Sequence, residues 1–193
     1  MTVFFDIETL DFFQDAHIKT LPRSLQLAHL RFGVAVVYDD TTDEWLEFWP
    51  NELPALWDNL TARGDLCGWN IRDFDLPVIW HNLARFHHYG DAELDELSNV
   101  IDLFADIRAT TGRWYKLDVI AEANLGRRKI AHGQQAAEWL RSADPELMKK
   151  AAEYCRDDVQ LVVDLWHKLQ RGEPLLLPAR PERNEHETLK WRR

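Results

Sequence analysis

The sequence has only two cysteines and no long apolar run, and these shortages exclude several classes of protein. Cys67 and Cys155 are too few for a disulfide framework and lie in apolar stretches, so we expect reduced thiols in the core. A membrane-spanning helix needs roughly 18 or more apolar residues in a row, and no segment approaches this. The N-terminal MTVFFDIETL lacks the basic region and cleavage site of a signal peptide, which favours a cytoplasmic protein without a membrane partner.

Basic side chains are also in short supply, with 23 Lys and Arg against 33 Asp and Glu and a net charge of -10. This balance argues against a protein that coats nucleic acid, because such binding comes largely from Lys and Arg displacing counterions from phosphates. It does not exclude an enzyme that reaches phosphate through metal ions, since the carboxylates holding the metals are part of the negative count.

The length of 193 residues fits one domain, and the 46% hydrophobic content, with nine Trp and nine Phe, is enough for a sizeable core. Apolar periodicity predicts alternating strands and helices after an initial hairpin, which indicates an α/β fold with a mixed five-stranded sheet flanked by helices. The predicted strands span 3–7, 32–38, 45–49, 65–69 and 99–103. The predicted helices span 52–63, 75–89, 116–124 and 145–171, with an irregular stretch before 116.

Two segments fit this pattern less well. Residues 11–31 form a long, partly helical excursion between the first two strands, and connections of this length often cover a cleft. Residues 173–193 contain three of the eight prolines and many charges, which predicts an extended C-terminal tail beside a domain of residues 1–172. The sequence identifies no protein partner for this tail.

Three acidic elements stand out, each with an ordinary alternative. Asp6 and Glu8 are two apart on a predicted strand, so both carboxylates face one side, although a strand end reaching solvent explains them equally well. Asp75 follows a strand and is by itself better explained as a helix N-cap. Tyr154 and Asp158 are four apart on a predicted helix and share one face, as ordinary surface residues also do.

Taken together, FDIET, GWNIRDFD and YCRDD, in this order, resemble the three exonuclease motifs of the DEDD superfamily, which has a ribonuclease H-like fold. The pattern of Asn, three residues, Phe and Asp is similar to that of family B DNA polymerase proofreading domains and their stand-alone relatives. WYKLDVIAEANLGRRK also looks like the segment preceding the third motif there. The resemblance covers residues 1–170. Tyr154 stands four residues before Asp158, and the residue five before it is Glu153 and not His, which indicates the Tyr subclass.

The resemblance implies a 3′-5′ exonuclease that uses two Mg²⁺ or Mn²⁺ ions, with Asp6, Glu8, Asp75 and Asp158 as ligands and Asp6 bridging. Hard cations need oxygen ligands, and two ions about 3.5–4 Å apart can activate water and stabilise the leaving oxygen of a phosphodiester. Tyr154 is the fifth catalytic residue, and the resemblance assigns it the orientation of the attacking water.

The resemblance also implies that Thr9 and Leu10 lie against the terminal nucleotide and that Asn70 and Phe74 contact the strand near the scissile phosphate. Trp69 is a candidate for stacking on a base, although a core role is the more common one for a Trp. Asp102 and Asp118 lie outside the three motifs and are not assigned to the site.

The implied substrate is the 3′ end of single-stranded DNA, with release of nucleoside 5′-monophosphates. A 3′-5′ exoribonuclease in RNA processing is the main alternative, because nothing in the sequence reads a 2′-hydroxyl. A noncatalytic nucleic-acid-binding relative is the alternative from another class.

Overall fold

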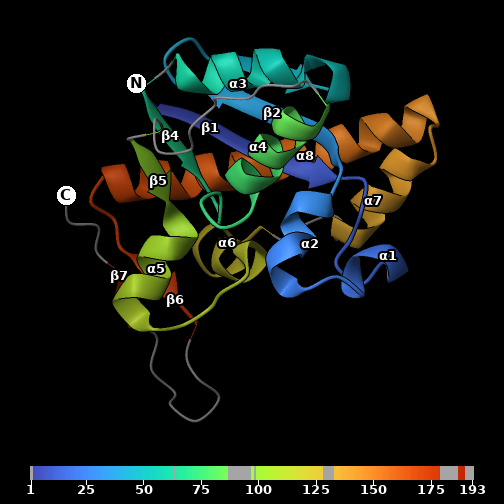
Figure 1. Ribbon diagram of the computed structural model, residues 1–193. Helices are drawn as coiled ribbons and strands as arrows, with labels where there is room; N and C mark the ends of the chain where they lie inside the picture. The colour runs from blue at the N-terminus through green and yellow to red at the C-terminus, as the bar shows by residue number, and fades with distance from the viewer. Residues whose placement is uncertain are drawn as a thin grey trace.

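A five-stranded mixed sheet forms the centre of the molecule (Figure 1). The computed structural model describes residues 2–62, 64–86, 97, 99–127, 133–178 and 187–189. The strand order is β3-β2-β1-β4-β5; the β1–β2 and β2–β3 pairs are antiparallel, and the β1–β4 and β4–β5 pairs are parallel. This confirms the predicted fold class. The strands are β1 (Thr2–Thr9), β2 (Phe32–Asp39), β3 (Glu44–Phe48), β4 (Asp65–Gly68) and β5 (Val100–Asp102).

Helices cover both faces of the sheet, and in Figure 1 α4 lies in front of it while the long α8 crosses behind. Val3, Phe5 and Ile7 of β1 pack into the core shared with α3 (Leu53–Thr61) and α4 (Asp75–Phe86). Phe4 points to the opposite face, into the core shared with α6 (Leu117–Leu125) and α8 (Pro145–Gln170). The strand alternation that the sequence predicts therefore separates two apolar layers.

The predicted helices are confirmed, with ends that differ by a few residues. The helix predicted from residue 52 starts with a 3₁₀ turn, η1 (Pro50–Glu52), before α3. Residues 87–89, at the end of the helix predicted over 75–89, lie outside the described residues. In the described part of the chain, no helix is long and apolar enough to cross a membrane.

The irregular stretch predicted before residue 116 is wrong, because it contains helix α5 (Leu103–Thr111). The Asp102 side chain caps its start by accepting a hydrogen bond from the Ala105 N–H, and Gly112 ends it in the left-handed conformation with φ 67°. These two capping residues were the signal from which the sequence could have predicted α5. Its apolar periodicity is weak, because only a narrow side of the helix is apolar. Helix α7 (Gly133–Arg141) was also not predicted.

The segment predicted as a tail begins with a short strand. Strand β6 (Leu175–Leu177) pairs antiparallel with β7 (Glu187–Leu189), and Leu175 and Leu177 are buried in the same core as α8. Residues 179–186 and 190–193 lie outside the described residues.

The excursion over residues 11–31 is partly helical, as predicted, and contains α1 (Ala16–Lys19) and α2 (Arg23–His29). Buried Asn82 of α4 fixes its end. The Asn82 Oδ1 accepts a 3.0 Å hydrogen bond from the Phe32 N–H, and its Nδ2 donates 2.8 Å bonds to the carbonyls of Leu30 and Val78. One amide side chain therefore joins the excursion, strand β2 and helix α4.

We predict that Asn82→Ala lowers the free energy of unfolding by about 1–3 kcal/mol, because the Phe32 N–H and Leu30 carbonyl would lose a buried partner. Denaturant titration of the purified variant measures this change. Asn51→Ala is the matched control, since Asn51 is exposed and its loss should change stability by less than about 0.5 kcal/mol. Equal effects of the two substitutions would contradict the role of Asn82.

Candidate active site

A cleft with a volume of about 910 Å³ lies at the carboxyl ends of β1 and β4. Its walls come from β1, the 11–31 excursion, the β4–α4 loop, the α5–α6 segment, the start of α7, and α8. These elements are far apart in the sequence, and the sheet brings them together because parallel neighbours end on the same edge. All five predicted catalytic residues line this cleft: Asp6, Glu8, Asp75, Tyr154 and Asp158.

Three of the carboxylates form a tight cluster. Asp6 and Glu8 lie on the same face of β1 as Phe4, toward α8, as their spacing of two predicts. Asp158 of α8 meets them there, and one oxygen from each of the three lies within 4.8 Å of the others. Glu8 is 9% exposed and Asp158 is 4% exposed, so these are not solvated surface acids. Asp158, rather than the adjacent Asp157, lines the cleft.

Asp75, the first residue of α4, lies beside this cluster. Its Oδ1 accepts a 3.1 Å hydrogen bond from the backbone N–H of Ile7, which ties the helix start to β1 between Asp6 and Glu8. Burial raises the pKa of Asp75 well above its ordinary value, and the negative charge of Asp6 raises it further. A helix cap alone does not account for this placement next to Asp6.

Tyr154 lies one turn before Asp158 on α8 and is 3% exposed. Burial raises the pKa of its hydroxyl far above 10, and the charges of Asp158, Glu8 and Asp6 raise it further. The hydroxyl is hydrogen-bonded to Asp158, so Tyr154 stays protonated and offers a neutral O–H at the site.

Beside Tyr154, the buried thiol of Cys155 donates to the Asp6 carbonyl at 3.2 Å, which agrees with the predicted core thiol.

Asp102, which the sequence analysis left outside the site, holds the β4–α4 loop in place. Its two carboxylate oxygens accept hydrogen bonds from the N–H groups of Asn70, at 2.9 Å, and Arg72, at 3.0 Å. Asn70 has a left-handed backbone with φ 64°, a conformation that Asn adopts more readily than most non-glycine residues, and the bond to Asp102 holds it there. Asp102 thus positions the backbone of the β4–α4 loop. Its place near the end of a predicted strand, where an Asp often caps a following helix, was the signal that could have identified it.

Of the four predicted substrate-binding residues, three lie in the cleft and one does not. Thr9, Asn70 and Phe74 line the cleft. The Thr9 hydroxyl donates to the Asp11 carbonyl at 2.7 Å, and Phe74 packs edge to face on Phe13 of the excursion. Leu10 is not part of the cleft lining given by the described residues; it packs against the apolar cluster of α7 and α8.

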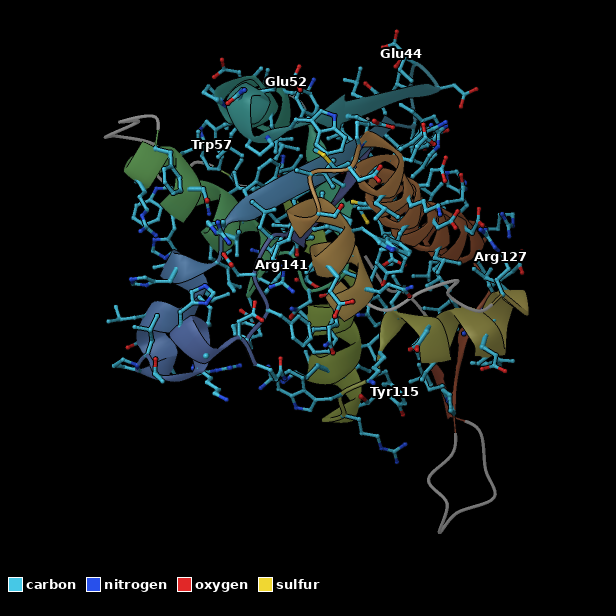
Figure 2. The ribbon with its side chains drawn as sticks, turned by 90° about the vertical axis from the view of Figure 1, so that its right-hand side faces the viewer. Glu44, Glu52, Trp57, Tyr115, Arg127 and Arg141 are labelled. Atoms are coloured by element: carbon cyan, nitrogen blue, oxygen red, sulfur yellow. The ribbon has the colours of Figure 1, made fainter. Side chains whose placement is uncertain are left out.

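The excursion adds Asp11 to the acids of the cleft, and sequence reasoning missed this residue. The fully buried Asp11 side chain accepts 2.8 and 2.7 Å hydrogen bonds from the Arg31 guanidinium and lies 3.2 Å from His17 Nε2. Burial acts to raise the pKa of Asp11, but the bonds from Arg31 outweigh it and the pKa is lowered. Asp11 therefore forms a structural ion pair with Arg31. Four residues after Asp11, Asp15 pairs with Arg141 (Figure 2) at 2.7 Å, which joins the excursion to α7.

The cluster has the chemistry of a site for hard divalent cations. Its donors are carboxylate oxygens, the ligands that Mg²⁺ and Mn²⁺ prefer. Burial raises the pKa of Asp75, and the negative charge of Asp6 raises it further, so a cation bound between these carboxylates would relieve part of this cost. Asp6 adjoins both Asp75 and the Glu8–Asp158 pair, so it is the carboxylate that connects the two groups of acids.

Comparison with known families assigns the chain to a superfamily. A family model of the RNase H superfamily matches residues 3–170, and the chain belongs to this superfamily. Membership indicates a nuclease that uses divalent metal ions and binds nucleic acid, which agrees with the acidic cluster in the cleft. No curated protein matches the sequence significantly.

We predict that Asp75→Asn stabilises the metal-free protein at neutral and alkaline pH. The pKa of Asp75 in the folded protein lies above its ordinary value of 3.8, so folding favours the protonated carboxyl group. The stability of the fold therefore falls as the pH rises from about 3.8 through the pKa of the folded state. Asn carries no charge and can still accept the bond from Ile7. Melting temperatures measured in EDTA across the pH range should fall less steeply for this variant than for the wild type.

Asp58→Asn, an exposed change on α3, is the matched control and should follow the wild-type pH profile. A profile for Asp75→Asn that also follows the wild type would show that folding does not raise the pKa of Asp75.

Proposed function

We propose that the protein is a 3′-5′ exonuclease that uses two Mg²⁺ or Mn²⁺ ions to hydrolyse phosphodiester bonds at the 3′ end of single-stranded DNA, releasing nucleoside 5′-monophosphates. The observation that carries this proposal is the convergence of all three motif segments on one cleft, with oxygens of Asp6, Glu8 and Asp158 within 4.8 Å of one another. Membership of the RNase H superfamily supports it.

Asp6, Glu8, Asp75 and Asp158 would hold the ions, with Asp6 between them. Two divalent ions bound there would supply the positive charge that activates water and stabilises the leaving oxygen. The protein contributes a rigid frame, because Asp6 and Glu8 lie on a central strand and Asp75 is bonded to that strand through Ile7. Preorganised charge of this kind lowers the barrier because little reorganisation is needed during the reaction.

Tyr154 would orient the attacking water. Its raised pKa means that it keeps its proton at neutral pH, so it serves as a hydrogen-bonding group and not as the base. Its hydrogen bond to Asp158 fixes the hydroxyl beside a proposed metal ligand, which is where the water must be held.

The shape of the cleft supports attack at a strand end. Phe12, Phe13 and Leu30 of the excursion form one wall beside Thr9, and the Asp11–Arg31 and Asp15–Arg141 pairs hold this wall in place. A fixed wall next to the carboxylates favours a terminal nucleotide over a strand that continues in both directions. DNA is the proposed substrate, and RNA of the same sequence is the direct comparison.

We expect 5′-labelled single-stranded DNA to shorten stepwise from its 3′ end with Mn²⁺ or Mg²⁺, and to stay intact in EDTA or with Asp6→Ala. Denaturing gel electrophoresis measures this, with RNA of the same sequence in parallel lanes. Faster shortening of the RNA would identify an exoribonuclease. Intact DNA and RNA under every metal condition would refute the proposed activity and leave a noncatalytic nucleic-acid-binding protein.

We predict that Tyr154→Phe lowers kcat by roughly 100-fold or more, because the ring still fills its buried place while the positioned hydroxyl is lost. KM should stay close to that of the wild type. Mn²⁺ should raise the melting temperature of the variant and of the wild type equally, since the four proposed ligands remain. Steady-state kinetics on the labelled DNA measures both constants. Tyr38→Phe, which removes a hydroxyl bonded to Asp43 outside the cleft, is the control and should keep its kcat.

A further inference from the structure

A row of three aromatic rings extends along the wall of the cleft formed by the β4–α4 loop and the α5–α6 segment. Trp69 follows β4, Phe104 lies in the first turn of α5, and Trp114 lies between α5 and α6. The ring centroids of Trp69 and Phe104 are 5.9 Å apart, and those of Phe104 and Trp114 are 5.1 Å apart. All three line the same cleft as the carboxylates. The row therefore starts beside Asn70 and continues away from it.

Trp114 is the most exposed large hydrophobic side chain of the described residues, at 65%. Phe104 beneath it is 7% exposed, so the row has a buried support and an open outer ring. Tyr115, the next residue, lies in the lower part of Figure 2, far from Glu44 and Glu52 near the top. An indole fixed in the wall of a cleft and left open to solvent offers a flat apolar face to a ligand.

Cations accompany this outer ring even though the chain is acidic. The Arg108 guanidinium lies 3.9 Å from the centre of the Trp114 ring and is half-exposed. Lys116 lines the cleft two residues further on. The acids near these cations are Asp118, which lines the cleft, and the exposed Asp73, whose Oδ2 lies 4.0 Å from the Arg108 guanidinium. Exposed aromatic rings with interleaved cations are the combination that binds single-stranded nucleic acid, because bases stack on the rings and phosphates pair with the cations.

We propose that Trp69, Phe104 and Trp114 form a binding site for nucleotides upstream of the scissile bond, in which Trp114 stacks on an unpaired base and Arg108 and Lys116 contact the adjoining phosphates. The occupant is single-stranded nucleic acid, since paired bases in a duplex do not expose their faces. This inference rests on the proposed function and extends it from the reacting end to the rest of the strand. Stacking is largely independent of base identity, so the site selects for strand length and not for sequence.

The test measures binding apart from cleavage. In the Asp6→Ala background, fluorescence anisotropy gives the Kd for a labelled long oligothymidylate, a dinucleotide, and the long strand with abasic sites upstream of its 3′ end. We expect Trp114→Ala to weaken binding of the long strand about tenfold, within the range for loss of one base stack, and to leave the dinucleotide unchanged. The abasic strand should bind equally to both proteins, because it has no base to stack.

Trp114→Phe, which keeps an aromatic ring, should restore most of the affinity for the long strand. Phe86→Ala is the matched control, because Phe86 is also an exposed aromatic residue, at 52%, and is not part of the cleft lining. An unchanged Kd of Trp114→Ala for the long strand would overturn the proposal, as would an equal loss for the dinucleotide or the abasic strand.

The two proposals fail separately. If the wild type cleaves DNA but Trp114→Ala does not change the Kd for the long strand, the stacking site is refuted and the exonuclease proposal stands. Binding that depends on Trp114, without cleavage by the wild type, would support the stacking site and refute the enzyme.

Discussion

Four carboxylates converge on one cleft and repel one another, and burial strengthens this repulsion because little water screens the charges. The protein holds them together by placing Asp6 and Glu8 on the central strand, Asp158 on the longest helix, and Asp75 at a helix start bonded to the Ile7 N–H. Apolar cores on both faces of the sheet supply the stability that opposes the repulsion. A fold that keeps such charges together has a built-in affinity for divalent cations, since cations relieve the repulsion.

The direction of the pKa shift distinguishes Asp75, which we propose as a metal ligand, from Asp11, a structural acid of the same cleft. Asp11 and Asp75 are both fully buried and line the same space, but Asp11 has Arg31 and His17 as partners and a lowered pKa. Asp75 faces Asp6, and its pKa is raised. Asp11 is thus already neutralised by the protein, whereas Asp75 stays available to a cation from solution. Perturbed groups of the second kind are the ones that mark functional sites.

Local periodicity predicted the parts of the molecule that follow one rule over many residues. The alternation of β1 placed Asp6 and Glu8 on one face, and the spacing of α8 placed Tyr154 with Asp158, as the structure has them. Sequence reasoning missed α5, because its ends are set by Asp102 and Gly112 and not by a strong apolar pattern. It also could not find the aromatic row, since Phe104 and Trp114 meet Trp69 only through tertiary packing.

The acidic charge of the chain and the binding of nucleic acid are compatible if affinity comes from sources other than many basic residues. A net charge of -10 disfavours long-range attraction of phosphates. Divalent ions in the carboxylate cluster would reverse the local charge where the scissile phosphate must lie. Stacking on Trp114, as we propose it, would gain affinity from the bases, which carry no charge, and would need only the few cations beside the ring. Metal ions at the carboxylate cluster and an aromatic ring in the wall of the same cleft would therefore hold a strand on an acidic protein, and only an unpaired strand could use both.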